Sequence, residues 1–429
     1  MAITLLAARR ALLQAIPELG ATYTPTAAAS GSITIGSLAN SNFPTNHFRN
    51  RIAYRGEAAT AADYERYLST LTAATGLITI TGSYADTTIT SESVEIWMDP
   101  EIRVSTHINP LLADAVSQLR VLCHVPLGHG PLDYDMQASG ITNWPDGSTG
   151  TTPAKQTTTT EVAAGARSLV VTDSGSGGGY TQSALYPLRA NGDVNVFAIV
   201  KAATGTAKLT VLDENGSTQA ILSTTEEDWV LLWKRVTMAG AEKIRLRPSS
   251  VAASDSGVWQ AAWFARADDF HYAISRVPGW ITAPHHVVGL SIGWPQVSAG
   301  TDAYHYGSML FERLTEGVDY YCQRPSADAN PTAIFLLKPG LAQYPLFIDV
   351  SSPASEPYGV TAAFTAETDT TFLSKELLLA QAKILLGERF PRYADQAQRG
   401  IKEKTQLLAQ EMYPTKEPRP TGWRKRPFG

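Results

Sequence analysis

A single pentapeptide has the spacing of a serine hydrolase nucleophile. Gly289, Ser291 and Gly293 stand in the order G-x-S-x-G, the pattern of a sharp strand-to-helix turn that presents a serine hydroxyl for acyl transfer. That turn needs a helix directly after the serine, but Trp294 and Pro295 follow here. We therefore expect Ser291 to lie in a strand with a glycine at each end, and we predict no catalytic residue and no enzyme.

Metal and cofactor chemistry has little support in the sequence. The nearest groupings of suitable residues are Cys123-His124 with His129, and the pair His285-His286. Neighbouring residues of a strand point to opposite faces, so His285 and His286 are poor ligands of one ion. The chain contains no H-E-x-x-H, P-loop or G-x-G-x-x-G pattern, and we predict no metal site and no cofactor. The role of paired carboxylates stays open, because their separation in space decides it.

Aromatic side chains offer another chemistry, because their flat rings can stack on the rings of sugars. The candidates are Trp144, Tyr180, Trp229 and Trp259, all in a stretch rich in Thr, Ser and Gly. Tryptophans that alternate along strands more often fill the core of a β-sandwich. We favour the core interpretation and keep glycan stacking as the alternative.

The C-terminal end concentrates positive charge. Residues 416–429 contain five Lys or Arg and one Glu, a net charge of +4. Because the whole chain has a net charge of −5, residues 1–415 carry −9. An acidic body does not wrap nucleic acid, whose phosphates need a basic face. Four prolines keep an arm over 414–429 extended. We expect this arm to dock on a partner, and the residues expected to contact it are Trp423, Arg424, Lys425, Arg426 and Phe428.

The elements that position these residues begin with a small α+β unit over 1–135. We expect a helix from Leu5 that Pro17 ends, a second helix over 60–76, strands over 77–82 and 93–97, and a third helix from Asn109 to Cys123. No run approaches the roughly 18 apolar residues that cross a bilayer, so no membrane span is predicted.

Residues 136–268 change to period-two strands separated by turn dipeptides such as Asn215-Gly216. In one strand Lys243, Arg245 and Arg247 alternate with apolar residues, as expected for a half-buried antiparallel strand. The segment predicts a β-sandwich. Its expected strands are RSLVVT, VNVFAIVK, AKLTVLD, WVLLWKRV, KIRLRP and VWQAAWFAR.

Two further segments complete the chain. Nine prolines over 269–366 favour an irregular β region whose clearest strands are AIFLLKP and YPLFIDV. Residues 367–413 predict two helices, the first buried through Leu373, Leu377 and Ile384, the second polar with a narrow apolar stripe that suits a partner surface. The predicted fold class is therefore mainly β and multidomain.

The order of motifs over 136–268 resembles the jelly roll of carbohydrate-binding modules. The resemblance is carried by NWPDG, GARSLVV, VFAIVKAATG, DWVLLWKRV and GVWQAAWF. It implies a β-sandwich and, less specifically, sugar binding. Gln260 and Ala262 stand where an acidic residue often follows the aromatic one in that family, which argues against a calcium site there.

The modular organisation resembles head-to-tail adaptor proteins of tailed bacteriophages, through FLSKELLLAQAKILLGERFPRYADQAQ, the polar helix behind it and WRKRPFG. The resemblance implies a structural virion protein, made in the host cytoplasm. It also implies a ring, dodecameric like the portal, that docks on the portal and contacts neck or tail proteins, while DNA only passes through its lumen. The alternative is a neck, tail or decoration protein whose jelly roll holds a host or environmental glycan. An enzyme acting on glycans ranks third.

Overall fold

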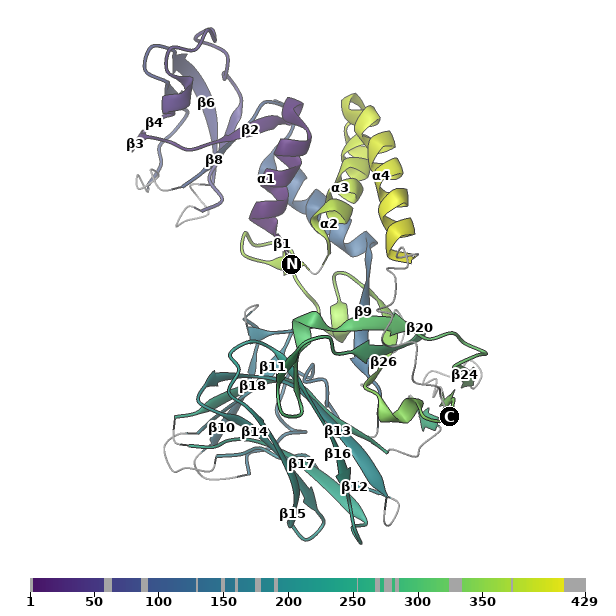
Figure 1. Ribbon diagram of the computed structural model, residues 1–429. Helices are drawn as coiled ribbons and strands as arrows, with labels where there is room; N and C mark the ends of the chain where they lie inside the picture. Colours follow the sequence, from purple (N-terminus) through teal and green to yellow (C-terminus); the bar gives the residue numbers. More distant parts are fainter. Residues whose placement is uncertain are drawn as a thin grey trace. The chain divides into compact units, whose positions relative to one another are not determined.

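The computed structural model describes residues 3–57, 64–85, 92–128, 130–147, 151–158, 161–173, 179–188, 192–252, 254–266, 271–273, 280–281, 285–323, 334–371 and 373–412 (Figure 1). The chain is mainly β and multidomain, as predicted. It divides into two compact units. The first combines residues 1–120 with the C-terminal segment from Ala362, and the second spans Val121–Thr361. No helix within the described ranges is long and apolar enough to cross a membrane.

The first unit contains a seven-stranded sheet, and its core is formed by residues such as Ile33, Ile78 and Ile96. A two-stranded pair, β1 (Ile3–Thr4) and β27 (Thr370–Thr371), joins the two ends of the unit. In spatial order the seven strands are β2 (Gly20–Tyr23), β8 (Val94–Trp97), β5 (Ile52–Tyr54), β6 (Glu65–Thr72), β7 (Leu77–Ile80), β4 (Ser32–Thr34) and β3 (Ala27–Ala29).

The helix expected over 60–76 is wrong, because residues 65–72 form strand β6 and a turn follows up to Gly76. Leu68 pairs with Ile80 and Leu71 with Ile78, with a bulge between the two pairs. The bulge puts two leucines that are three residues apart on the same buried face, and this spacing imitates a helical period. Gly76 has a φ of +70° in the turn to β7, so it closes a hairpin instead of ending a helix.

Helix α1 (Leu5–Ala15) is present as predicted, and the Thr4 hydroxyl caps it by accepting from the Ala7 amide at 3.1 Å. Helix α2 (Asn109–Gln118) ends five residues before the predicted end at Cys123. The chain turns extended at Leu119 and continues as strand β9 (Arg120–Pro126). Val121 and Leu122, which were expected in the helix, therefore belong to strand β9 and to the second unit.

Helices α3 (Lys375–Arg389) and α4 (Ala394–Met412) lie side by side (Figure 1). Of the three residues predicted to be buried, Leu373 and Leu377 are 2% exposed, while Ile384 is only half-buried. Leu373 lies just before the first residue of α3. Helix α3 also packs against α1 and α2. A glycine permits its close contact with α4: a Cβ on Gly400 would lie 2.5 Å from the Ala380 carbonyl oxygen.

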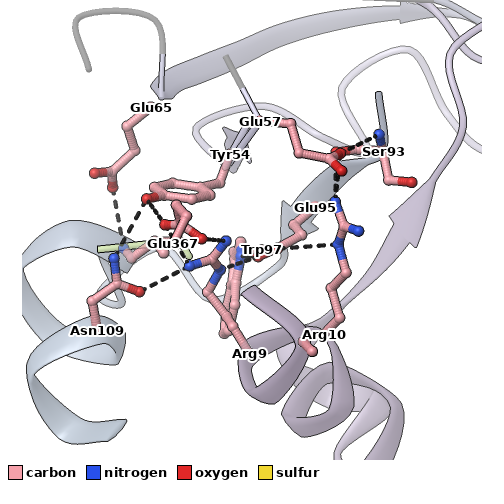
Figure 2. A network of polar contacts seen from close by, with 12 residues as sticks. Arg9, Arg10, Tyr54, Glu57, Glu65, Ser93, Glu95, Trp97, Asn109 and Glu367 are labelled. Atoms are coloured by element: carbon pink, nitrogen blue, oxygen red, sulfur yellow. Dashed lines mark hydrogen bonds and ion pairs between the residues drawn. The ribbon is translucent and has the colours of Figure 1, made fainter. Parts of the chain in front are cut away.

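A buried polar network ties α1 to the sheet and to the C-terminal segment of the first unit (Figure 2). Arg9 is fully buried and donates to Glu95 Oε2 at 2.6 Å and to both carboxylate oxygens of Glu367 at 2.8 Å. Its guanidinium lies 4.3 Å from the centre of the Tyr54 ring and also donates to Asn109 Oδ1. Burial alone would lower the pKa of Arg9, but the two carboxylates outweigh it and raise that pKa.

The second unit contains the predicted β-sandwich, and all six expected strands are present. Its seven-stranded sheet runs β10 (Thr151–Gln156), β11 (Ser168–Asp173), β18 (Ser256–Arg266), β13 (Asp193–Thr204), β16 (Val230–Thr237), β22 (Ala303–His305) and β21 (Ser298–Gly300). Its four-stranded sheet runs β12 (Tyr186–Pro187), β17 (Lys243–Ser250), β14 (Ala207–Asp213) and β15 (Thr218–Thr224).

A third layer covers the outer face of the seven-stranded sheet. Phe197 and Trp263 on that face pack in one core with Leu290 and Phe347 of the next sheet. The central strands β13 and β18 are therefore buried on both faces. The covering sheet consists of β23 (Leu310–Arg313), β20 (His286–Trp294), β26 (Leu346–Pro353) and β9, and a smaller sheet consists of β19 (His271–Ala273), β25 (Ile334–Leu337) and β24 (Tyr320–Gln323).

Candidate functional site

Two of the four candidate stacking residues lie inside the sandwich core. Trp144 and Trp259 are 0% exposed, and the Trp144 indole donates to the Asp133 carbonyl at 3.0 Å. With no exposed ring face, neither can stack on a sugar in this structure. This placement agrees with the core interpretation favoured from the sequence.

The other two candidates are half-buried and belong to different sheets. Tyr180 lies beside β17, where the Arg247 guanidinium is 4.1 Å from its ring centre and Gly147 packs against the ring. Trp229 precedes β16 with the Lys201 ammonium 5.5 Å from its ring centre. The structure does not bring the four aromatic residues together.

Ser291 lies in the middle of strand β20, as expected, and not at a strand-to-helix turn. Its hydroxyl donates to Asp349 Oδ2 at 2.8 Å, and the other oxygen of Asp349 contacts His124 Nδ1 at 2.9 Å. The carboxylate stands between the serine and the histidine, so the histidine is not placed to accept the serine proton. In the described part of the chain, no group of three or more Cys, His, Asp or Glu could hold a metal ion.

The predicted docking arm lies outside the described residues. This applies to Trp423, Arg424, Lys425, Arg426 and Phe428, and to His129 of the predicted histidine grouping. The expectations placed on them stay predictions.

A cavity of about 580 Å³ in the second unit is the strongest candidate site. It lies where the segment before β10 meets the loop before β11 and the segment that follows β26. Its wall combines the aromatic side chains of Trp280 and Tyr358 with polar residues. Those polar residues are Asp133, Asp135, Gln137, Ser139, Asn143, Arg167 and Thr361.

Asp135 is the unusual group of this cavity. It is 3% exposed, and its Oδ2 accepts from the Trp280 indole nitrogen at 3.2 Å. Its Oδ1 has no hydrogen-bond partner among the described residues. Burial raises the pKa of Asp135 to about 7, and the neighbouring charge of Asp133 adds to this effect. The cavity therefore holds a carboxyl group that titrates near neutral pH and has a free oxygen.

Asp133 differs because its hydrogen-bonding capacity is used within the protein. Its Oδ2 accepts from the Lys155 ammonium at 2.6 Å and its Oδ1 from the Ala138 amide at 2.6 Å. Lys155 also donates to the Met136 carbonyl at 2.9 Å. The Asp133–Lys155 pair is internally neutral, so it anchors the wall and leaves Asp135 as the carboxyl group of the cavity without an ion-pair partner in the described chain.

The backbone around the cavity is strained. Asp133, Met136 and Tyr358 have φ values of 56°, 61° and 53°, a left-handed region that side chains other than glycine rarely occupy. Gly359, with a φ of 69°, lies so close to Trp280 that a Cβ would be 2.2 Å from the Trp280 Cβ. Such strain concentrates where the backbone shapes a functional site.

Two buried glutamines hold the loop beside the cavity in place. Gln137 Oε1 accepts from the amides of Ala166 and Arg167 at 2.9 and 3.2 Å. Gln260 Oε1 accepts from the amides of Ala163 and Ala164 at 2.9 and 3.1 Å, and its Nε2 donates to the Arg167 carbonyl at 2.9 Å. The Gln260 amide thus binds neighbouring backbone at the position where the sequence argued against a calcium ligand.

Sequence reasoning did not find this cavity. The only local signal is the pair Asp133 and Asp135 inside the otherwise apolar stretch PLDYDM. The aromatic wall comes from Trp280 and Tyr358, more than 100 residues later in the chain.

Comparison with known proteins gives partial structural likenesses. No family model matches the sequence, and no curated protein matches it. An enzymatically active domain of tailspike protein 4 from bacteriophage CBA120 is 15% identical, with a TM-score of 0.26, over 32% of this chain and 21% of that one. This chain thus matches about a fifth of that domain.

Carbohydrate-binding modules are also among the similar structures. The CBM22-1 xylan-binding domain of Xyn10C from Paenibacillus barcinonensis is 17% identical over 32% of this chain and 96% of that one, with a TM-score of 0.26. TmCBM61 in complex with β-1,4-galactotriose is 15% identical over 32% and 98%, with a TM-score of 0.23. The β-sandwich itself is established by the strand pairing described above.

Proposed function

We propose that this chain is a carbohydrate-binding protein that holds a sugar in the cavity at Asp135. The observation that carries the proposal is a buried carboxyl group with a free oxygen beside the aromatic wall of Trp280 and Tyr358. The volume of the cavity, about 580 Å³, falls within the range of roughly 300–1,000 Å³ that is usual for small-ligand sites.

The chemistry of the wall suits a polyhydroxylated ligand. Sugar hydroxyl groups both donate and accept, and the cavity is lined by the Asp135 carboxyl group, the Asn143 amide and the Arg167 guanidinium, which together supply acceptors and donors. The Asp133–Lys155 pair cancels its own charge. A neutral sugar therefore fits better than a strongly charged ligand.

The test is a glycan array followed by calorimetry with the full chain. Asn143→Ala is the cleanest variant, since the Asn143 side chain makes no hydrogen bond to the described residues. We expect Asn143→Ala and Trp280→Ala to weaken binding of the array hit at least about tenfold. Tyr321→Ala, which removes a ring that is 61% exposed on another surface, is the matched control. Unchanged binding by a folded Asn143→Ala variant would exclude this cavity.

We also propose that the protein is a component of a tailed-phage virion, with the head-to-tail adaptor ring as the second candidate role. This role is favoured by Ile401, an apolar side chain that is 54% exposed on α4, the helix that precedes the basic arm in the sequence. Deleting residues 414–429 should leave folding intact and abolish binding to a recombinant portal ring. Equal binding by the truncated chain would exclude the arm as the docking element.

A further inference from the structure

The outer face of the four-stranded sheet carries a stripe of positive charge that the cavity does not use. We propose that this basic face, formed by Lys208, Lys243, Arg245 and Arg247, binds an acidic polysaccharide. None of these residues lines the cavity. The inference therefore stands independently of the sugar-binding cavity.

The register of the sheet gathers the four cations on one face. Lys243, Arg245 and Arg247 alternate along β17 with inward residues, so their side chains share the outer face at intervals of about 7 Å. Arg247 is opposite Thr210 on β14, and Lys208 is opposite Ser249. Side chains that face one another across an antiparallel pair lie on the same side, which places Lys208 beside the same stripe.

These cations lack acidic partners, unlike those of the neighbouring sheet. No ion pair in the described part of the chain includes any of the four, and the Nε atoms of Arg245 and Arg247 have no hydrogen-bond partner there. In the seven-stranded sheet, by contrast, the cations Lys201, Lys234 and Arg235 pair with Glu161, Asp302 and Asp193.

The nearby polar groups do not neutralise the stripe. Arg247 donates to Gln182 Oε1 at 3.1 Å and stacks on Tyr180, and both contacts leave its charge unpaired. Glu214 lies at the Lys243 end, where its carboxylate accepts from the backbone amides of Glu242 and Lys243. Neighbouring like charges are unfavourable, so an external anion is expected to stabilise this face.

Acidic polysaccharide fits this face better than nucleic acid. DNA carries one charge per about 1.7 Å, and its binding proteins commonly contact six to ten phosphates, whereas this stripe has four cations on a body of charge −9. Binding of single strands also uses open aromatic rings, and the Tyr180 ring here is covered by Arg247. The cations of this face are about 7 Å apart, a wider spacing than that of the charges of DNA. A glycan with a carboxylate on every sugar ring, or on every second ring, matches this wider spacing.

The experiment uses affinity electrophoresis of the full chain in gels containing polygalacturonate, neutral dextran or oligo(dT). We expect retardation by polygalacturonate that weakens as salt is added, and none by dextran. Arg245→Gln with Arg247→Gln should weaken polygalacturonate binding about tenfold at low salt. Lys234→Gln with Arg235→Gln is the matched control, since it removes the same charge from the other sheet.

Several outcomes would overturn the inference. They are no retardation by polygalacturonate, stronger retardation by oligo(dT), or equal loss in the Lys234/Arg235 control. If the double arginine variant does not fold, Lys208→Gln with Lys243→Gln tests the same face, and unchanged binding by that variant would count against the proposal. Asn143→Ala separates the two sites, because it should leave polygalacturonate binding unchanged.

Discussion

Replacing Asp135 by asparagine should make the protein more stable and less able to bind sugar. The pKa of Asp135 is about 7 in the folded chain, against an ordinary value of 3.8. A difference of this size corresponds to about 4 kcal/mol between the protonated and ionised forms. The folded protein bears this penalty at alkaline pH because burial removes the carboxylate from water. Asparagine keeps an oxygen for the Trp280 indole and carries no charge.

The sign of the pH dependence follows from the raised pKa. Between about pH 4 and pH 7 the folded state holds the Asp135 proton and the unfolded state does not, so the free energy of unfolding falls as pH rises. Above pH 7 the penalty is complete. Asp135→Asn should therefore match the wild-type stability near pH 4 and exceed it by about 4 kcal/mol at pH 8.

The assay is urea unfolding followed by tryptophan fluorescence at pH 4, 6 and 8, with both proteins measured in parallel. Glu227→Gln, which neutralises an exposed carboxylate of the same unit, is the control and should change stability by less than about 0.5 kcal/mol at every pH. A stability difference between wild type and Asp135→Asn that stays constant from pH 4 to pH 8 would refute the assignment of a buried titrating carboxyl group.

Three further outcomes follow from the packing. Arg9→Met should lower the free energy of unfolding by about 3–5 kcal/mol, because the buried Glu95 and the largely buried Glu367 lose an ion-pair partner. Arg235→Met, at a more exposed ion pair with Asp193, should cost less than about 1 kcal/mol in the same urea titration. Gly400→Ala should lower the thermal midpoint by forcing α4 away from an α3 carbonyl, at about 1–3 kcal/mol. A fragment over 121–361 should be monomeric by gel filtration, whereas one over 136–268 should aggregate because it exposes the outer face of the seven-stranded sheet.

The sandwich strands were predictable because their local pattern agrees with their final environment. Lys243, Arg245 and Arg247 alternate with buried Ile244 and Leu246 on β17, and the turn at Asn215-Gly216 connects β14 to β15, with Gly216 at a φ of 81°. Strand β6 was missed because its bulge replaced the two-residue period by a three-residue spacing. The error thus came from one extra residue in the pairing of β6 with β7, and not from a weak preference of these residues for strands.

The cavity could not be predicted because its properties arise only in the folded chain. The sequence shows Asp133 and Asp135 but not that Lys155 neutralises the first and that burial raises the pKa of the second. The positive φ values of Met136 and Tyr358 also have no local marker, since neither residue favours that conformation. Residues that a sequence pattern would place in a turn or a core here shape the wall of the cavity.

The distribution of aromatic residues explains why ligand binding is expected away from the large sheet. Trp259 and Trp263 are four residues apart on β18, a spacing that predicts the same face. The pairing with β13 shifts between Ile199 and Val200, leaving Gln260 as the extra residue, so Trp259 enters the sandwich core and Trp263 the core of the third layer. Both faces of this sheet are thus filled by the protein's own side chains. We therefore look for the proposed glycan contacts away from this sheet, at the cavity beside Asp135 and at the basic face of the four-stranded sheet, where Asp135 Oδ1 and the Nε atoms of Arg245 and Arg247 have no hydrogen-bond partner in the described chain.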